Sequence, residues 1–410
     1  MRIDDAVAIT HEGARRADNE DAVLHLDEPL VLAVADGMGG ASVGRRAAEI
    51  AVETVRGYGP KLSSALRRVG RRRSTHNRLG LTGLLDDLFN SASRVIGEEK
   101  IQRSAPGMGT TLVLATIVKN FAYIAHVGNS RAYVFRRGRL VRLTEDHSLA
   151  EFRFRRGRIS REEYERSPDR HLLYQALGAG VEVEVDVAEV RLLDGDLLLL
   201  CSDGLTRAVD EDIIVGQIDG AGAQGTAEAL LEAALAAGAE DNVSIAVARL
   251  RAEDGDEPVE VLTEAMRQVF LFRDLSETEL LVIAPYLEEE VYPKSATIVS
   301  EGDPGDSFYV VASGRVRVSR GSTKLVDIKS GGHFGELSLA RPTERSATVR
   351  AMVPTRLFTL HRDRFQELLR SKPELGAKLS LALLDAVGDR LRDLSDRLAA
   401  VEKAVRGDLK

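Results

Sequence analysis

The stretch VLAVADGMGG, residues 31–40, decides the fold of the first half of this sequence. Its first five residues are small or branched and apolar, which predicts a buried strand. The strand leads to the acid Asp36 and a glycine turn, and a carboxylate that leaves water needs a partner. The apolar run 197–201 leads to Asp203 in the same way, and Asp241 precedes the apolar run 243–250. We therefore expect these acids to bind a partner that compensates their charge.

The whole-chain composition predicts a globular protein of two or three domains, because 410 residues with 44% hydrophobic residues can bury large cores. A net charge of −8 does not favour nucleic acid or an anionic membrane surface as a partner. The single cysteine, Cys201, excludes an internal disulfide and is interpreted as core packing. We find neither a signal peptide nor an apolar run of about 20 residues, so we expect a cytoplasmic protein.

The pattern of apolar residues predicts an α+β protein of four parts. Residues 1–252 alternate short β-rich runs with helix-period stretches at 42–57, 80–102 and 223–238, and the acidic residues 253–262 are a linker. Residues 263–375 hold short strands with glycine turns, which predicts a small β-barrel, and residues 376–410 form a closing helix.

Two charged or apolar stretches favour contacts with partners. The closing helix repeats apolar residues three and four apart, which favours a homodimer seam over packing on its own domain. These residues are Leu384, Val387, Leu391, Leu394, Leu398, Val401 and Val405. The basic stretch 67–78 lies between predicted helices without interleaved aromatic residues, so we interpret it as a solvated loop or a partner-docking face.

The acids of the first 252 residues favour hard divalent cations. Mg²⁺ and Mn²⁺ prefer oxygen ligands, and the sequence offers acids without cysteine or histidine clusters. The motif RADNED adds Glu20 and Asp21, and its Arg16 is a cation suited to phosphate oxygens. A single acid of this kind is more often a turn or cap residue, but several acids after strands, with an arginine, indicate phosphoryl chemistry.

Eight motifs in this region resemble those of the bacterial metal-dependent Ser/Thr protein phosphatases, the PPM or type 2C family. They are RADNEDA, VADGMGG, GMGTTLV, HVGNSRAYVF, LTEDHSL, YQALG, CSDGLT and AEDNVSIAV, in the family's order. The resemblance implies an α-β-β-α sandwich with two Mg²⁺ or Mn²⁺ ions per active site. It implies that Asp36 bridges the ions, that the Gly37 carbonyl and Glu20 or Asp21 complete the shells, and that Asp203 and Asp241 hold one ion. Arg16 would seat the phosphate of a phosphoserine or phosphothreonine protein.

Two positions depart from the family pattern. Asn129 stands where the family usually has an acid, and Arg207 replaces a second acid, four residues after Asp203. Because an amide is a poor ligand and a guanidinium repels cations, we expect the family's third metal site to be lost. The alternative function is a catalytically weak or inactive scaffold that binds phosphoprotein and senses cyclic nucleotide. Residues 147–172 correspond to the family's flap, and their basic character favours acidic phosphopeptides.

The string GGHFGELSLARPTERSATV, residues 331–349, has its own chemistry. A turn at Gly335, Glu336 and Leu337 would present backbone N–H groups to an anion, with Arg345 and Ser346 as further donors. The string resembles the phosphate-binding cassette of cyclic-nucleotide-binding domains, most closely the version in bacterial catabolite activator proteins. The resemblance implies that these five residues bind a cyclic nucleotide, and we favour cAMP over cGMP. We predict a metal-dependent protein Ser/Thr phosphatase that this nucleotide regulates.

Overall fold

The computed structural model describes residues 2–180, 182–218, 222–251 and 266–407, and it divides the chain into two compact units. The first unit is Met1–Pro258 and the second is Val259–Lys410. The predicted linker at 253–262 lies outside the described residues.

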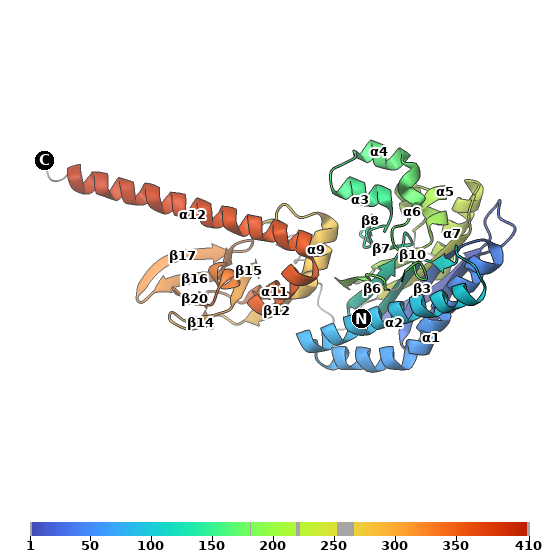
Figure 1. Cartoon of the computed structure of the whole chain (residues 1–410). Coiled ribbons are helices and arrows are strands. Elements are labelled where there is room, and N and C mark those ends of the chain that lie inside the picture. Colours follow the sequence, from blue (N-terminus) through green and yellow to red (C-terminus); the bar gives the residue numbers. More distant parts are fainter. Residues whose placement is uncertain (1, 181, 219–221, 252–265, 408–410) are drawn as a thin grey trace. The chain divides into compact units, whose positions relative to one another are not determined.

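The first unit contains two antiparallel sheets (Figure 1). The six-stranded sheet has the order β2 (Asp21–Asp27), β3 (Leu30–Met38), β5 (Leu112–Val118), β6 (Phe121–Val127) and β9 (Asp186–Arg191), and β4 (Gly109–Thr110) pairs with β3. The five-stranded sheet has the order β1 (Arg2–His11), β11 (Val243–Arg251), β10 (Leu197–Cys201), β7 (Arg131–Arg136) and β8 (Arg139–Arg142). The central strands β3, β5, β6, β10 and β11 are apolar and largely buried, as the sequence predicts for layers inside a sandwich, whereas β1 and β8 are mostly half-buried or exposed.

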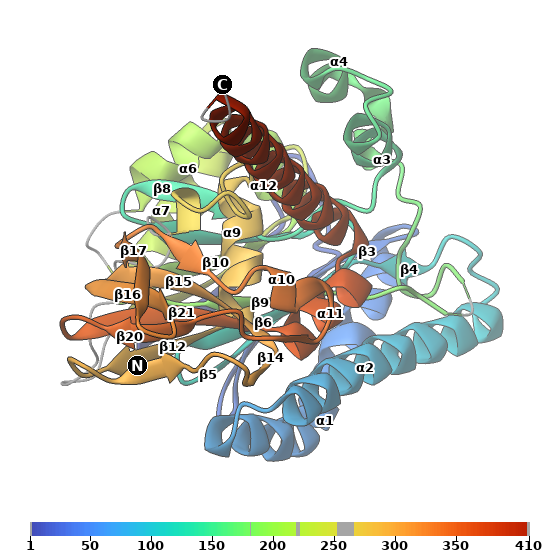
Figure 2. The ribbon, with the colours of Figure 1, turned by 90° about the vertical axis from the view of Figure 1, so that its left-hand side faces the viewer.

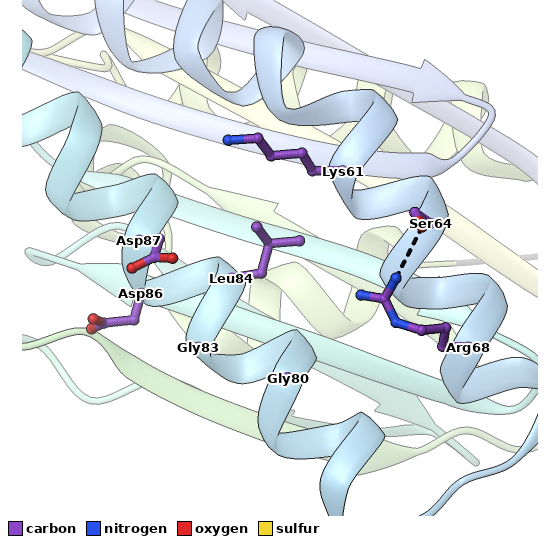
Figure 3. A pocket seen from close by; sticks show the side chains of 8 residues that line it. All are labelled: Lys61, Ser64, Arg68, Gly80, Gly83, Leu84, Asp86 and Asp87. Carbon is purple, nitrogen blue, oxygen red and sulfur yellow. Dashed lines mark hydrogen bonds between the residues drawn. The ribbon is translucent and has the colours of Figure 1, made fainter.

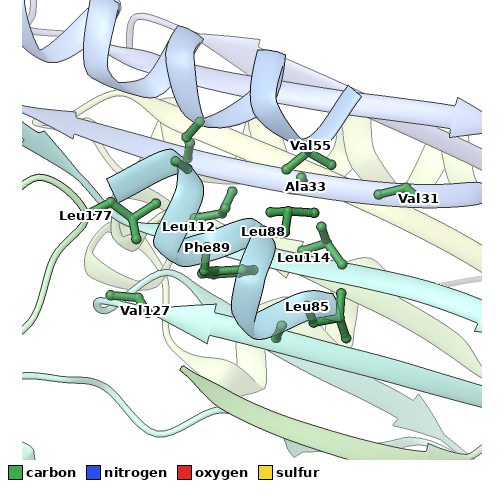
Figure 4. Close-up of a cluster of buried hydrophobic side chains, with 14 of the residues drawn as sticks. Val31, Ala33, Val55, Leu85, Leu88, Phe89, Leu112, Leu114, Val127 and Leu177 are labelled. Carbon is green, nitrogen blue, oxygen red and sulfur yellow. The ribbon is translucent and has the colours of Figure 1, made fainter. Parts of the chain in front are cut away.

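Helices cover the outer faces of both sheets. The long helices α1 (Ala41–Arg71) and α2 (Thr75–Gln102) pack against β3 and its neighbours, and Figure 4 shows Val55 of α1 and Phe89 of α2 facing Ala33 and Leu114. On the other sheet lie α5 (Asp203–Ala208), α6 (Glu211–Gln217) and α7 (Gly222–Ala236). The predicted α-β-β-α sandwich is confirmed.

The basic stretch 67–78 is mostly helical and not a loop, although most of its basic side chains are exposed, as expected. The predicted helices 42–57 and 80–102 both extend into it, because α1 continues past Pro60 to Arg71 and α2 begins at Thr75. Arg78 is buried, and Arg73 and Arg78 both contact Glu189 of β9. Tyr123 donates to the same carboxylate at 2.7 Å. The two guanidiniums are thus neutralised where they meet the sheet.

The second unit is a barrel of two four-stranded antiparallel sheets, which Figure 2 shows beside its long last helix. One sheet has the order β12 (Leu287–Tyr292), β21 (Thr355–His361), β15 (Ser307–Ser313) and β18 (His333–Phe334). The other has the order β13 (Thr297–Val299), β20 (Thr348–Ala351), β16 (Arg315–Arg320) and β17 (Thr323–Lys329), and β14 (Pro304–Gly305) pairs with β19 (Thr343–Glu344). The helices named for the described part of this unit are α9 (Glu277–Ile283), η2 (Ala284–Tyr286), α10 (Leu337–Ala340), α11 (Arg362–Ser371) and α12 (Pro373–Gly407).

The closing helix α12 has a buried face and an exposed apolar face. Leu375, Leu379 and Leu383 pack into the core of the second unit. Leu384 and Leu391 of the predicted seam are 67% and 66% exposed, and Val387 is 40% exposed. The side chains of the remaining seam residues lie outside the description. In the described part of the chain, none of the helices is long and apolar enough to cross a bilayer.

Candidate functional site

The acids singled out in the first unit converge at one rim of the sandwich. Asp21 of β2 lies directly opposite Asp36 of β3 in the ladder between these strands. Asp203 begins α5 after β10, and Asp241 lies just before β11, in the other sheet. The sheets pack face to face, and the charges of Asp21, Asp203 and Asp241 all raise the pKa of Asp36. Strands from distant parts of the sequence therefore gather four carboxyl groups.

The two central acids are costly to ionise without a cation. Burial, reinforced by the neighbouring acids, holds the pKa of Asp36 well above its usual range. Burial also raises the pKa of Asp21 to about 7. Neither carboxylate oxygen of Asp21 accepts a hydrogen bond from the residues that the structure describes, although the Ser202 and Ser244 hydroxyls lie nearby. Buried, unpartnered oxygens of this kind fit the all-oxygen ligand sets of Mg²⁺ and Mn²⁺.

Glycines at the rim allow the backbone to approach the acids closely. A Cβ at Gly37 would lie 2.1 Å from the Gly44 carbonyl oxygen, and one at Gly44 would lie 2.0 Å from Glu20 Oε2. A Cβ at Gly204 would lie 1.9 Å from the Asn242 carbonyl oxygen. Any larger residue would displace Glu20 or the turn before β11, so the glycines of the DG motifs are required by packing.

Asn242 is a structural member of the site that the sequence did not single out as one. Its Oδ1 accepts from the Glu20 backbone N–H at 2.8 Å, and its Nδ2 donates to the carbonyl oxygens of Glu12 and Asp18 at 2.9 Å. It thereby holds the RADNED loop against β11. The signal that would have found it is its place directly after Asp241 in AEDNVSIAV. Burial raises the pKa of Glu20, which Arg16 partly opposes.

Arg16 and the two departures from the family pattern contact the acids of the second sheet. Arg16 Nε lies 3.1 Å from Asp241 Oδ1, and its Nη2 donates to Asp241 Oδ2 at 3.2 Å. Asn129 Nδ2 donates to Asp203 Oδ2 at 2.8 Å. Arg207 Nη1 lies 3.1 Å from Asp241 Oδ2. Asn129 thus contacts Asp203, and Arg207 lies 3.9 Å from Asp203 and closer to Asp241.

A second cluster near the rim, His126, His147 and Asp186, has ligand atoms within 4.8 Å of one another. The Gly128 backbone N–H donates to His147 Nδ1 at 3.3 Å, so neutral His147 carries its proton on Nε2, which is 3.3 Å from Asp186. His126 Nε2 donates to the Glu145 carbonyl oxygen at 2.8 Å. Both nitrogens of His147 have hydrogen-bond partners, Gly128 and Asp186. These contacts connect β9 to the loop that contains Gly128 and Asn129.

The flap, residues 147–172, contains α3 (Leu149–Arg155), α4 (Arg161–Arg166) and η1 (Pro168–His171). Several of its arginines contact acids of the same region, as in the pairs Arg153–Asp169 and Arg155–Glu145. These ion pairs neutralise part of the positive charge that the sequence predicts for the flap. His171, the last residue of η1, brings the flap to the acids, with Nδ1 3.7 Å from Asp203 Oδ2.

A groove between α1 and α2 contains none of the candidate site residues. Figure 3 shows Lys61, Ser64 and Arg68 of α1 on one side and Asp86 and Asp87 of α2 on the other. Arg68 donates to Ser64 at 3.0 Å within its own helix. The groove therefore has charges of both signs and no converging cluster, and it is not part of the acid centre.

The predicted phosphate cassette of the second unit forms a compact turn around Arg345. Arg345 is buried, and its Nη1 donates to the Ser307 carbonyl oxygen at 2.9 Å and to Ser338 Oγ at 3.1 Å. Gly335 has a φ of +84°, and a Cβ there would lie 2.9 Å from Arg345 Nη1. Glu336 and Leu337 continue the turn into α10, and Ser346 is exposed next to Arg345. Ser338 is a contact that the sequence analysis missed.

Oxygen ligands at the rim of a double sheet, beside arginines suited to phosphate, define a metal-dependent phosphohydrolase. A family model described as protein phosphatase 2C matches residues 9–243, more than half of the chain. The chain belongs to this family and is a protein serine/threonine phosphatase. A second model, described as a cyclic nucleotide-binding domain, matches residues 289–372. The resemblances found in the sequence are confirmed.

Curated relatives and solved structures agree with this assignment. The chain is 36% identical over 205 residues to the serine/threonine phosphatase Stp of Listeria welshimeri, which covers 49% of this chain and 78% of that protein. It is 32% identical over 257 residues to the protein phosphatase PhpP of Streptococcus pneumoniae, covering 60% and 98% of the two chains. The structure of the Mycobacterium tuberculosis phosphatase PstP has a TM-score of 0.53 at 30% identity and covers 60% of this chain and 99% of that one. Another PstP structure is described as a complex with two manganese ions.

Proposed function

We propose that the acids of the first unit bind two Mn²⁺ or Mg²⁺ ions and that the second unit binds a cyclic nucleotide, cAMP in preference to cGMP, that regulates phosphatase activity. Asp36, the Gly37 carbonyl, Glu20 and Asp21 would hold the ions on the first sheet, and Asp203 and Asp241 on the second. The observation that supports this proposal most strongly is the buried Asp21 carboxylate, which lacks a hydrogen bond within the described structure and lies opposite Asp36.

The residues of the chain then orient the substrate. When bound, the ions supply Lewis-acid polarisation of the phosphoryl oxygens and lower the pKa of water. Arg16 carries a permanent charge and a planar set of donors, so it suits two oxygens of a phosphoserine or phosphothreonine. Its contact with Asp241 orients the guanidinium at the rim. The flap brings His171 to the same rim and lies where a phosphoprotein would approach.

We propose that this chain does not form the family's third metal site. Asn129 offers its Nδ2 donor to Asp203, and Arg207 places a positive charge beside Asp241. An amide N–H and a guanidinium do not bind cations. Two ions are therefore the expected number, and replacing both residues by acids, Asn129→Asp with Arg207→Asp, is expected to add a third.

The nucleotide proposal rests on the turn around Arg345. A buried guanidinium that is fixed by Ser307 and Ser338 is preorganised for a cyclic phosphate, and Gly335 leaves room for it. Glu336 suits a ribose hydroxyl as an acceptor, and Ser346 offers a further donor. We also propose that the exposed apolar face of α12, with Leu384, Val387 and Leu391, forms a homodimer seam, because its heptad spacing matches a coiled coil.

The deciding experiment measures hydrolysis of p-nitrophenyl phosphate and of a phosphothreonine peptide with Mn²⁺, with and without cAMP or cGMP. The Asp36→Asn variant serves as the blank. We expect wild-type rates well above the blank and a change in rate with cAMP at lower concentration than with cGMP. Wild-type rates equal to the blank would favour the scaffold alternative. Unchanged rates and unchanged sedimentation at saturating nucleotide would contradict the regulatory proposal.

A further inference from the structure

Arg207 lies between the two acids of the second sheet. It follows Asp203 by one turn of α5, and its Nη1 is 3.1 Å from Asp241 Oδ2 and 3.9 Å from Asp203 Oδ2. Asp203 Oδ2 also accepts from Asn129, and Asp241 Oδ2 also accepts from Arg16. One oxygen of each acid is therefore turned toward donors that belong to the chain itself.

The charge of Arg207 acts on these acids in two opposite ways. A guanidinium remains protonated at all accessible pH values, so it offsets the repulsion between the carboxylates permanently. It also limits the rotation of Asp241, to which it donates a hydrogen bond at 3.1 Å, whereas Asp203, at 3.9 Å, is affected only by its charge. The same positive charge opposes any divalent ion that binds these carboxylates, because like charges a few ångströms apart repel.

We propose that Arg207 is a positioning residue that sets the Mn²⁺ affinity of the acid centre. It holds Asp241 through a hydrogen bond, offsets the charge of Asp203, and weakens the binding of divalent ions to both acids. Occupancy of the centre, and hence activity, then follows the available Mn²⁺ concentration. This inference rests on the proposed function, because it takes Asp203 and Asp241 as metal-binding acids.

The position of Arg207 makes it suitable for substitution. Its side chain is 37% exposed and lines an open cavity with Arg15, Glu240 and Asp241, so its removal leaves no hole in the core. Arg94 provides a matched control, because it also lies on a helix of the first unit and contacts only an exposed partner among its described ion pairs, Glu98. The conservative variant Arg207→Lys keeps the charge near the acids.

The test is calorimetric titration of the EDTA-treated, dialysed full-length protein with Mn²⁺, together with thermal unfolding in EDTA. For Arg207→Gln we expect the Mn²⁺ affinity to rise about tenfold with an unchanged number of ions, from the loss of one charge near divalent ions in a solvent-facing site. In EDTA we expect the same variant to have a lower melting temperature than the wild type, because the two acids lose their compensating charge. Arg207→Lys is expected to restore most of the wild-type affinity, and Arg94→Gln to leave it unchanged.

The two readouts move in opposite directions only if Arg207 acts through its charge on the metal-binding acids. A residue with a purely structural role would lower stability and weaken Mn²⁺ binding together. Unchanged or weaker Mn²⁺ binding by Arg207→Gln would overturn the inference. If the wild type itself takes up no Mn²⁺, the proposed function fails, which is a separate result.

Discussion

His126 is expected to make the first unit sensitive to acid. It lies on β6 opposite Asp186, is 3% exposed, and donates through Nε2 to the Glu145 carbonyl oxygen. Burial, with His147 next to it, lowers its pKa from 6.5 to about 3, although Asp186 and Asp146 partly oppose this shift. The folded protein therefore keeps His126 neutral in a pH range in which the unfolded chain protonates it.

The sign and size of the effect follow from this difference. Between pH 6.5 and pH 3 the unfolded state binds more protons at this residue, so the free energy of unfolding falls as the pH falls. The unfolded chain protonates His126 with a pKa of 6.5. At pH 5 this lowers the free energy of unfolding by about 2 kcal/mol relative to pH 8. For a unit of this size, that loss lowers the melting temperature by roughly 4–8 °C.

Scanning calorimetry of the full-length protein in EDTA at pH 8 and pH 5 measures this effect. His126→Gln retains an amide donor for Glu145 but cannot titrate, so its loss of stability between these pH values should be smaller by about 2 kcal/mol. The exposed residue His76 gives the control, because His76→Gln should show the full wild-type loss. Equal losses in His126→Gln and the wild type would refute the reasoning.

Three further predictions concern the acid centre, the core and the nucleotide turn. Asp36→Asn should lower kcat/KM for a phosphothreonine peptide by roughly a thousandfold with Mn²⁺, about 4 kcal/mol, in steady-state kinetics; activity within tenfold of wild type would contradict the metal role. Glu189→Gln leaves Arg73 and Arg78 without their shared carboxylate and should cost about 3–5 kcal/mol in urea unfolding, whereas Glu98→Gln at an exposed pair should cost under about 0.5 kcal/mol. Arg345→Ala should weaken cAMP binding by about a hundredfold in calorimetry, or ~3 kcal/mol. An unchanged affinity would show that Arg345 does not bind the phosphate.

Much of the fold was predictable because short runs of apolar residues indicate its buried strands. The run 31–35 is apolar without interruption, as expected for a strand buried on both faces, and β3 extends over it. Helix ends were less predictable. The expected helix 42–57 ends at Gly57, just before Gly59 and Pro60, because these residues disfavour helix locally. The helix α1 nevertheless continues to Arg71, because its apolar face packs on α2 and the sheet.

The basic stretch shows where local reading fails. Arg78 stands among other arginines and resembles a solvated residue, but it is 3% exposed and contacts Glu189, 111 residues away. Asn242 is a similar case, since it receives the Glu20 N–H from 222 residues away. The residues around Arg78 do not indicate that it contacts Glu189, and the residues around Asn242 do not indicate that it contacts Glu20.

The sequence by itself determined which residues end the buried strands, and so which acids, glycines and arginines were available for chemistry, because strand periodicity and turn chemistry act over a few neighbouring residues. Only the tertiary structure decided which charges meet: Arg207 with Asp241, Arg78 with Glu189, and Asp21 with Asp36. Electrostatic interactions depend on separation in space, and the packing of the two sheets, not the spacing along the chain, sets those separations.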